Sequence, residues 1–319
     1  MGGRVCREEV KEEKRRSPGR EDSLTSADKI RRFTKQSGHN VLSLARRGLK
    51  DAPGELWELL ELEKLNLSLN NLKALPPQLA LLSNLLVLNL WGNQLGSLPA
   101  EIGQLRRLRV LFVYRNRLTE VPEELGACTQ LEVLSLANNQ LSSLPASLSN
   151  LTRLRKLNLS HNLMAQLPGC IYSMKALVFL DLSCNRLENV AENIQALLEL
   201  KILIMERNQL QSLPRGLCFL TRLELLNLDF NHIRDLPEMV LNGCSTWWAV
   251  QSQSLLIYHL IVSECMRSRC FPEMLLCSPL SLRSSFLRSP LATLSFRCFL
   301  VTPWIYPLSS LRSWPFFPW

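Results

Sequence analysis

The chain has 319 residues, of which 46% are hydrophobic and 20% charged, and its net charge is +9. Basic residues outnumber acidic ones by 11 to 7 in residues 1–38 and by 6 to 2 in residues 244–319, whereas the segment between holds 20 against 19. Because the excess charge lies in the two ends and does not line one groove, these numbers argue against a nucleic-acid-binding protein.

Residues 1–38 are predicted to be a disordered, charged arm. The arm begins MGGRVC, so removal of Met1 would expose Gly2 in a pattern similar to a myristoylation signal, with Cys6 in place of Ser or Thr. A second acyl chain on Cys6 would make such an anchor stable. Gly2 and Cys6 are therefore candidate lipidation sites, with an unmodified arm as the alternative.

A strict 23-residue repeat follows the arm. One asparagine stands in each of eight copies: Asn70, Asn93, Asn116, Asn139, Asn162, Asn185, Asn208 and Asn231. The frame around each is L-x-x-L-x-L-x-x-N-x-L-x-x-L-P, and a weaker first copy has Arg47 in the asparagine position. Residues 39–243 are therefore predicted to form about nine repeats that bury a core only by stacking on one another.

Each part of the frame predicts one part of the structural unit. The L-x-L segment alternates, so both leucines of a short strand face the core. The asparagine side chain carries donors and an acceptor that can satisfy backbone groups in the bend. Apolar residues at every third position after the L-P step, such as Leu79, Leu82 and Leu85, predict a short helix or 3₁₀ turn on the return side.

This frame resembles the leucine-rich repeat, and its L-P-x-x-L return arm is similar to the intracellular repeats of Ras-pathway and polarity scaffolds. The resemblance covers about residues 41–243. It implies an α/β solenoid with a curved parallel β-sheet on its concave face and short helices or 3₁₀ turns on its convex face. It also implies an intracellular adaptor that binds another protein through the concave face.

Two groups of residues depart from the small polar side chains that otherwise follow the predicted concave face. They are Trp91, Phe112, Tyr114 and Arg115, and then Phe179, Ile202, Ile204, Glu206, Arg207 and Phe230. Trp91 and Tyr114 share one frame position, so we expect them one strand spacing apart, about 5 Å. Exposed aromatic residues beside arginine are typical of protein interfaces, although such residues also favour strands for purely structural reasons. Both groups are predicted to contact a protein partner.

Catalytic and metal sites are not indicated by the sequence. The four histidines are far apart, no glycine-rich phosphate loop is present, and Cys265, Cys270 and Cys277 lack the paired spacing of a zinc site. We therefore expect no enzyme activity, no cofactor, no metal and no small-molecule substrate. Cys128 occupies a leucine position and is predicted to be a buried thiol, and the absence of a cysteine-rich cap or secretion signal favours a reducing cytoplasmic compartment.

Two other functions stay open at this point. One is a regulatory subunit of a signalling enzyme in a phosphatase or small-GTPase pathway. Residues 109–112 spell R-V-L-F, similar to a peptide that docks on protein phosphatase-1, but the repeat frame places Leu111 in the core and favours a structural role. The other is a scaffold that contacts a membrane peripherally through Gly2 and Cys6; no stretch of about 20 apolar residues is present to span one.

The repeat frame is lost between Val240 and Gly243. A further copy needs apolar residues or asparagine at positions where the sequence has Thr246, Ala249, Gln251 and Ser254. Residues 244–319 contain no Gly, Lys, Asp or Asn but hold five of the seven tryptophans, which predicts an atypical, disordered tail. Either Trp247 and Trp248 cover the last repeat, or the tail is a variant terminus with no specific role.

Overall fold

The computed structural model describes residues 40–234 and the dipeptide 250–251, in which short strands and 3₁₀ helices alternate. The strands are β1 (Val41–Ser43), β2 (Lys64–Asn66), β3 (Val87–Asn89), β4 (Val110–Phe112), β5 (Val133–Ser135), β6 (Lys156–Asn158), β7 (Phe179–Asp181), β8 (Ile202–Ile204), β9 (Leu225–Asn227) and β10 (Val250–Gln251). The 3₁₀ helices are η1 (Gly54–Glu58), η2 (Pro77–Leu81), η3 (Ala100–Gln104), η4 (Glu123–Ala127), η5 (Ala146–Asn150), η6 (Gly169–Ser173), η7 (Glu192–Ala196) and η8 (Arg215–Phe219).

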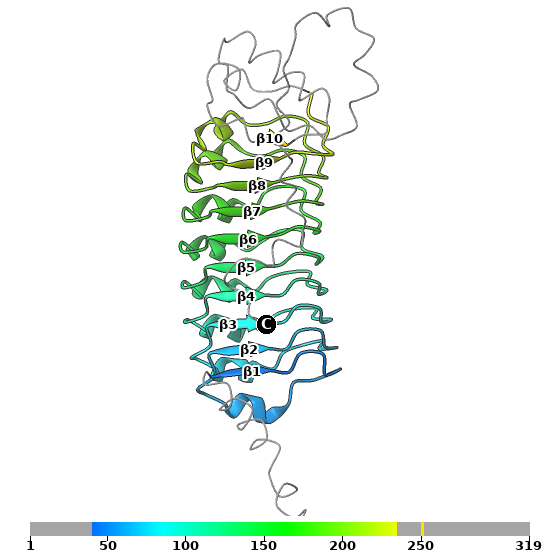
Figure 1. The fold of residues 1–319 in the computed structure, drawn as a ribbon, viewed down its shortest axis with the longest axis vertical. Helices are drawn as coiled ribbons and strands as arrows, with labels where there is room; N and C mark the ends of the chain where they lie inside the picture. Colours follow the sequence, from blue (N-terminus) through cyan, green and yellow to red (C-terminus); the bar gives the residue numbers. More distant parts are fainter. Residues whose placement is uncertain (1–39, 235–249, 252–319) are drawn as a thin grey trace, which may run out of the picture.

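All ten described strands pair in parallel with their chain neighbours and form one sheet, stacked in order from β1 to β10 (Figure 1). From β1 to β9 each strand residue pairs with the residue 23 positions further on, as Leu88 does with Leu111. The repeat length sets this register, because a one-residue slip would turn each core leucine towards solvent. The predicted leucine-rich repeat solenoid, with 3₁₀ turns on the return side, is confirmed.

The core is a continuous column of apolar side chains from neighbouring repeats. Leu88 and Leu90 from the strand side meet Ile102 and Leu105 from the return side, and all four are fully buried. Cys128 takes the position of Leu105 in the next repeat and is also fully buried, as predicted. Its thiol donates a hydrogen bond to the Ile102 carbonyl oxygen at 3.3 Å. Stacking, rather than any single repeat, therefore creates the core.

A ladder of buried asparagine side chains joins each repeat to the one before it. Asn139 Nδ2 donates to the carbonyl oxygens of Leu136 at 2.9 Å and Val113 at 3.1 Å, and Asn139 Oδ1 accepts from the Leu118 N–H at 3.0 Å. Val113 and Leu118 belong to the preceding repeat. The same three kinds of contact recur in all eight copies of the frame. This asparagine ladder satisfies backbone groups that the bend would leave unpaired.

The residue before each asparagine position adopts a left-handed backbone conformation. These residues are Arg46, Leu69, Gly92, Arg115, Asn138, His161, Cys184, Arg207 and Phe230, with φ from 52° to 70°. This conformation costs a residue other than glycine about 1–2 kcal/mol, yet only Gly92 is a glycine. The asparagine ladder beside these residues must therefore hold each turn in place.

Strand β10 extends the sheet beyond the point where the sequence frame is lost. Val250 pairs with Leu226 and Gln251 with Asn227, which is an offset of 24 residues instead of 23. A frame with no insertion misses this strand, because one extra residue shifts every later position. Two residues of the predicted tail thus belong to the sheet. The remainder of residues 244–319 and the arm of residues 1–38 lie outside the described residues.

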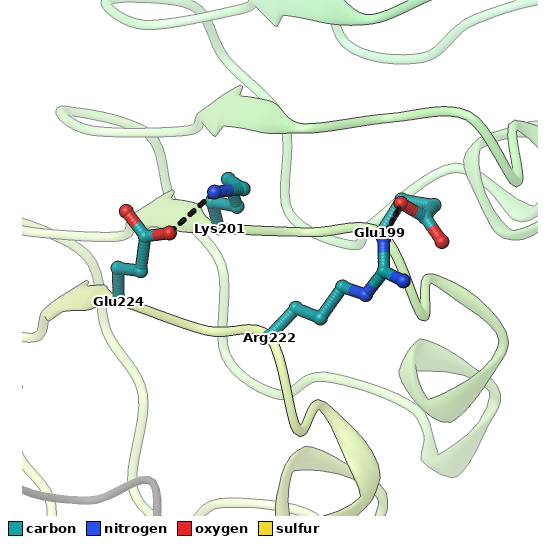
Figure 2. Close-up of polar contacts among 4 residues, drawn as sticks. All are labelled: Glu199, Lys201, Arg222 and Glu224. Carbon is teal, nitrogen blue, oxygen red and sulfur yellow. Dashed lines mark hydrogen bonds and ion pairs between the residues drawn. The ribbon is translucent and has the colours of Figure 1, made fainter.

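Charged side chains on the loop that enters each strand also repeat every 23 residues. Lys201 Nζ lies 2.5 Å from Glu224 Oε1, and the Arg222 guanidinium pairs with the Glu199 carboxylate (Figure 2). Both ion pairs join neighbouring repeats, but all four side chains are about half exposed. Exposed pairs of this kind contribute about 0–1 kcal/mol each, so they balance charge at this edge more than they stabilise the fold.

Replacing Asn139 by alanine should lower the free energy of unfolding by about 1–3 kcal/mol, because the buried Leu118 N–H loses its acceptor. Urea denaturation followed by circular dichroism measures this change. The exposed neighbour Gln140 provides a control, and Gln140→Ala should change the free energy by less than about 0.5 kcal/mol. Equal losses in the two variants would contradict a stabilising role for the ladder.

Candidate functional site

The solvent side of the sheet is formed by three positions of each repeat. In the β4 repeat these are Val110, Phe112 and Tyr114, which are half-buried and alternate with the fully buried Leu111 and Val113. Alternation along an extended chain places the first three side chains opposite the core. We call this surface the sheet face; it is the face on which the sequence predicts partner binding.

Trp91, Phe112, Tyr114 and Arg115 lie together on the sheet face at β3 and β4, and we call them the aromatic cluster. The rings of Trp91 and Tyr114 stack with their centroids 5.2 Å apart and their planes at 7°, as their shared frame position predicts. The Phe112 ring meets the Tyr114 ring edge-on at 6.3 Å and 81°. Such contacts are worth about 0.5–1.5 kcal/mol each beyond area burial, so the three rings hold one another in position.

The Tyr114 hydroxyl stays protonated at neutral pH. Burial raises the pKa of Tyr114 above its usual value, while the Arg115 guanidinium partly lowers it. The aromatic cluster thus combines three apolar rings with two hydrogen-bond donors, the Tyr114 hydroxyl and the exposed Arg115 guanidinium.

The frame position of Trp91 and Tyr114 carries small side chains in most other repeats: Ala45, Ser68, Ala137, Ser160 and Ser183. Only the last two full repeats, with Glu206 and Asp229, carry larger ones. The two stacked rings therefore stand between small neighbours, Ser68 on one side and Ala137 on the other.

The middle strand position has a structural role that Phe112 and Ile204 do not perform. In five repeats this residue is Asn or Asp, and its Oδ1 accepts the backbone N–H two residues further on at 2.9–3.2 Å: Asn66, Asn89, Asn158, Asp181 and Asn227. The side chains of Phe112 and Ile204 have no acceptor, so their repeats forgo a hydrogen bond worth about 1 kcal/mol. The turn does not explain why these two apolar residues are present.

The second predicted group lies on β7 to β9, and we call it the C-terminal strip: Phe179, Ile202, Ile204, Glu206, Arg207 and Phe230. The Arg207 guanidinium carbon lies 4.5 Å from the centre of the Phe230 ring, which is 53% exposed. Glu206 Oε2 accepts from Asn227 Nδ2 at 2.8 Å. Three strand spacings, or about 14 Å, separate β4 from β7, so the structure does not join the strip to the aromatic cluster.

Asp181, which the sequence reasoning did not select, is the most perturbed carboxyl group of the sheet face. Burial raises its pKa, the nearby Glu206 carboxylate raises it further, and hydrogen bonds from Ser183 lower it. Those hydrogen bonds come from the Ser183 N–H at 3.0 Å and the Ser183 hydroxyl at 2.7 Å, both to Asp181 Oδ1. The available signal was an aspartate in a position where other repeats have asparagine.

A carboxyl group with a raised pKa binds its proton more tightly in the folded chain than in the unfolded chain. Its contribution to stability is therefore present below the unfolded value of 3.8 and is lost as the pH rises through the folded pKa. Asp181→Asn should raise the melting temperature at about pH 7, with a difference that shrinks as the pH falls towards about 3. Asparagine retains the Oδ1 acceptor, as Asn158 shows. Thermal unfolding across this pH range measures the effect, and a variant less stable than the wild type at neutral pH would contradict it.

The described residues contain no group of three or more His, Cys, Asp or Glu side chains that could hold a metal ion. Burial raises the pKa of Cys128 and Cys170 to about 11, so both thiols stay protonated at neutral pH and are poor nucleophiles. Leu111 of the R-V-L-F segment is fully buried within β4, which agrees with its structural assignment. Gly2 and Cys6 lie outside the described residues.

No helix among the described residues has the length and apolar character needed to cross a membrane.

Comparison with known proteins supports the same fold. Residues 40–167 match a leucine-rich repeat region model, and no curated protein sequence matches the chain. A leucine-rich repeat protein of Leptospira interrogans is 34% identical, with a TM-score of 0.61, and the match covers 66% of this chain and 60% of that one. The chain thus spans less than two thirds of that protein.

Two further solved structures are similar. The leucine-rich repeat domain of the type III effector XopL is 26% identical, with a TM-score of 0.54, and the match covers 67% of this chain and 76% of that one. The plant peptide hormone receptor RGFR1, solved in complex with RGF2, is 21% identical, with a TM-score of 0.56, and the match covers 66% of this chain and 34% of the receptor. Together with the parallel sheet, the 3₁₀ turns and the asparagine ladder, these likenesses show that the described part of the chain is a leucine-rich repeat solenoid.

Proposed function

We propose that this protein is a non-enzymatic, cytoplasmic adaptor that binds another protein through the sheet face, with the aromatic cluster at the centre of the contact. The observation that carries this proposal is the coplanar stack of Trp91 on Tyr114, with Phe112 set edge-on against it. Tryptophan, tyrosine and arginine are the residues that most often dominate the binding energy of protein interfaces.

The arrangement of the rings favours binding over a purely structural role. Because each ring is held by its neighbour before a partner arrives, binding costs less side-chain entropy than it would for mobile side chains. Phe112 also stands where asparagine would supply a turn hydrogen bond in other repeats. A preference of aromatic residues for strands accounts for Phe112 but not for Trp91 and Tyr114, which follow the strands.

The C-terminal strip extends the proposed contact along the same face. Its half-buried Phe179, Ile202 and Ile204 add apolar surface, while Glu206 and Arg207 add charge at the rim. An apolar centre with a charged rim fits a protein partner better than a small molecule. The adaptor can act in a signalling complex, as a regulatory subunit would, and acylation of Gly2 and Cys6 would place it at a membrane surface.

The double variant Trp91→Ala/Tyr114→Ala should weaken partner binding at least about 100-fold, since truncation of a central aromatic residue costs about 2 kcal/mol or more. Affinity purification from cells with quantitative mass spectrometry identifies the partner, and isothermal titration calorimetry with the purified partner measures the loss. Enzyme activity that copurifies with the wild type but not with the variant would identify a regulatory subunit.

A matched control removes two exposed apolar side chains from the return side, where Leu198 is 55% and Phe219 is 48% exposed. Leu198→Ala/Phe219→Ala should leave the affinity within about twofold of the wild type, because these side chains lie away from the sheet face. Circular dichroism of both variants checks that the solenoid stays folded. Undiminished binding by the Trp91/Tyr114 variant would rule out the sheet face as the centre of the contact.

A further inference from the structure

Exposed basic side chains gather on the loops that enter β4, β6 and β7. They are Arg106, Arg107, Arg109, Arg153, Arg155 and Lys175, and we call this surface the basic edge. At the corresponding positions before β5, the chain has Thr129, Gln130 and Glu132. Among the described loops of these four repeats, Glu132 is therefore the one carboxylate beside six cations. The near-neutral charge of the repeat array hides this local excess.

Backbone hydrogen bonds stack these loops directly on one another. The Glu132 N–H donates to the Arg109 carbonyl oxygen at 2.8 Å, and the Arg155 N–H donates to the Glu132 carbonyl oxygen at 2.8 Å. The three side chains thus form a column with about one strand spacing between its members. Arg109 also directly precedes β4, the strand that carries Phe112 of the aromatic cluster.

Two of the arginines are held in place by neutral groups of the preceding repeat. Arg107 Nη1 donates to Asn84 Oδ1 at 2.7 Å, and Arg153 Nη1 donates to Gln130 Oε1. These hydrogen bonds restrict the guanidinium groups without cancelling their charge. Restricted guanidinium groups retain donors for a carboxylate and lose less entropy when they bind one.

The same loops near the C-terminal end of the sheet show the opposite arrangement. There Lys201 pairs with Glu224 and Arg222 pairs with Glu199, so positive and negative side chains alternate from repeat to repeat (Figure 2). On the basic edge the described ion pair is Arg109 with Glu132, at 3.8 Å. Arg155 instead lowers the pKa of Lys156, which burial also lowers, and this marks repulsion between like charges. Charge pairing across repeats is available to this fold and is largely missing here.

We propose that the basic edge binds a segment of the protein partner that is rich in aspartate and glutamate, beside the contact with the aromatic cluster. This inference rests on the proposed function and names the chemistry of the partner. From β4 to β7 the edge covers three strand spacings, about 14 Å, which matches about four or five extended residues. Its small extent, interrupted by Glu132, suits a short acidic segment better than a nucleic-acid duplex or a membrane.

The test starts from a library of random 16-residue peptides displayed on phage and selected on the full-length protein. Selected peptides are synthesised, and those whose affinity depends on Trp91 and Tyr114 are retained. The inference expects these peptides to carry an acidic run. Arg153→Gln/Arg155→Gln should weaken them about tenfold or more, and higher salt should weaken them as well.

The matched control is Lys201→Gln/Arg222→Gln, which removes two positive charges from the same two frame positions in the ion-paired part of the edge. It should change the affinity by less than about twofold, because these charges already have partners. An equal loss in both variants would mean that net charge alone drives binding, and would overturn the inference.

Two further outcomes separate the inference from the proposed function. Peptides that need Trp91 and Tyr114 but carry no acidic run and ignore Arg153 and Arg155 would overturn the inference alone. Selected peptides that never depend on the aromatic cluster would overturn the proposed function. Phosphatidylserine vesicles and a duplex RNA complete the test, and binding of either with the same dependence on Arg153 and Arg155 would replace the acidic protein segment with a general anion site.

Discussion

The asparagine ladder is the interaction on which the rest of the solenoid depends. Each asparagine joins its own turn to the turn of the preceding repeat, so the local bend and the contact between repeats are parts of one hydrogen-bonded unit. The leucine column supplies the hydrophobic stabilisation, but it does not by itself define where the chain turns. The ladder keeps consecutive strands in a 23-residue register, and that register is what places Trp91 against Tyr114 and Arg155 beside Glu132.

The fold could be read from the sequence because its determinants are local and periodic. The L-x-L alternation, the asparagine and the L-P step each indicate one element, and eight copies in phase leave one arrangement that satisfies them all. The ring stack of Trp91 and Tyr114 follows from the same periodicity, since two residues at one frame position must be neighbours. Strand β10 was missed because its offset of 24 residues breaks the period on which the reasoning relied.

Other properties of the surface depend on contacts that a linear pattern does not reveal. The raised pKa of Asp181 results from burial and from Glu206, which is 25 positions away in the sequence, about one repeat. The basic edge was hidden for a related reason: counted over the whole array, its arginines are balanced by carboxylates elsewhere, and only stacking shows that the balance fails in the middle repeats. A net charge describes a domain, whereas recognition depends on where the charges lie.

The left-handed turns have a consequence for the chemistry that this scaffold can display. Glycine would relieve the backbone strain at every one of these positions, yet it occurs once in nine, and the other eight carry side chains as different as Arg115, His161 and Phe230. The scaffold thus accepts local strain in exchange for one additional variable side chain per rung, beside the strand positions. These nine residues form a line along the solenoid, in which neighbouring members can be changed one at a time while the hydrogen-bonded rungs beneath them stay the same.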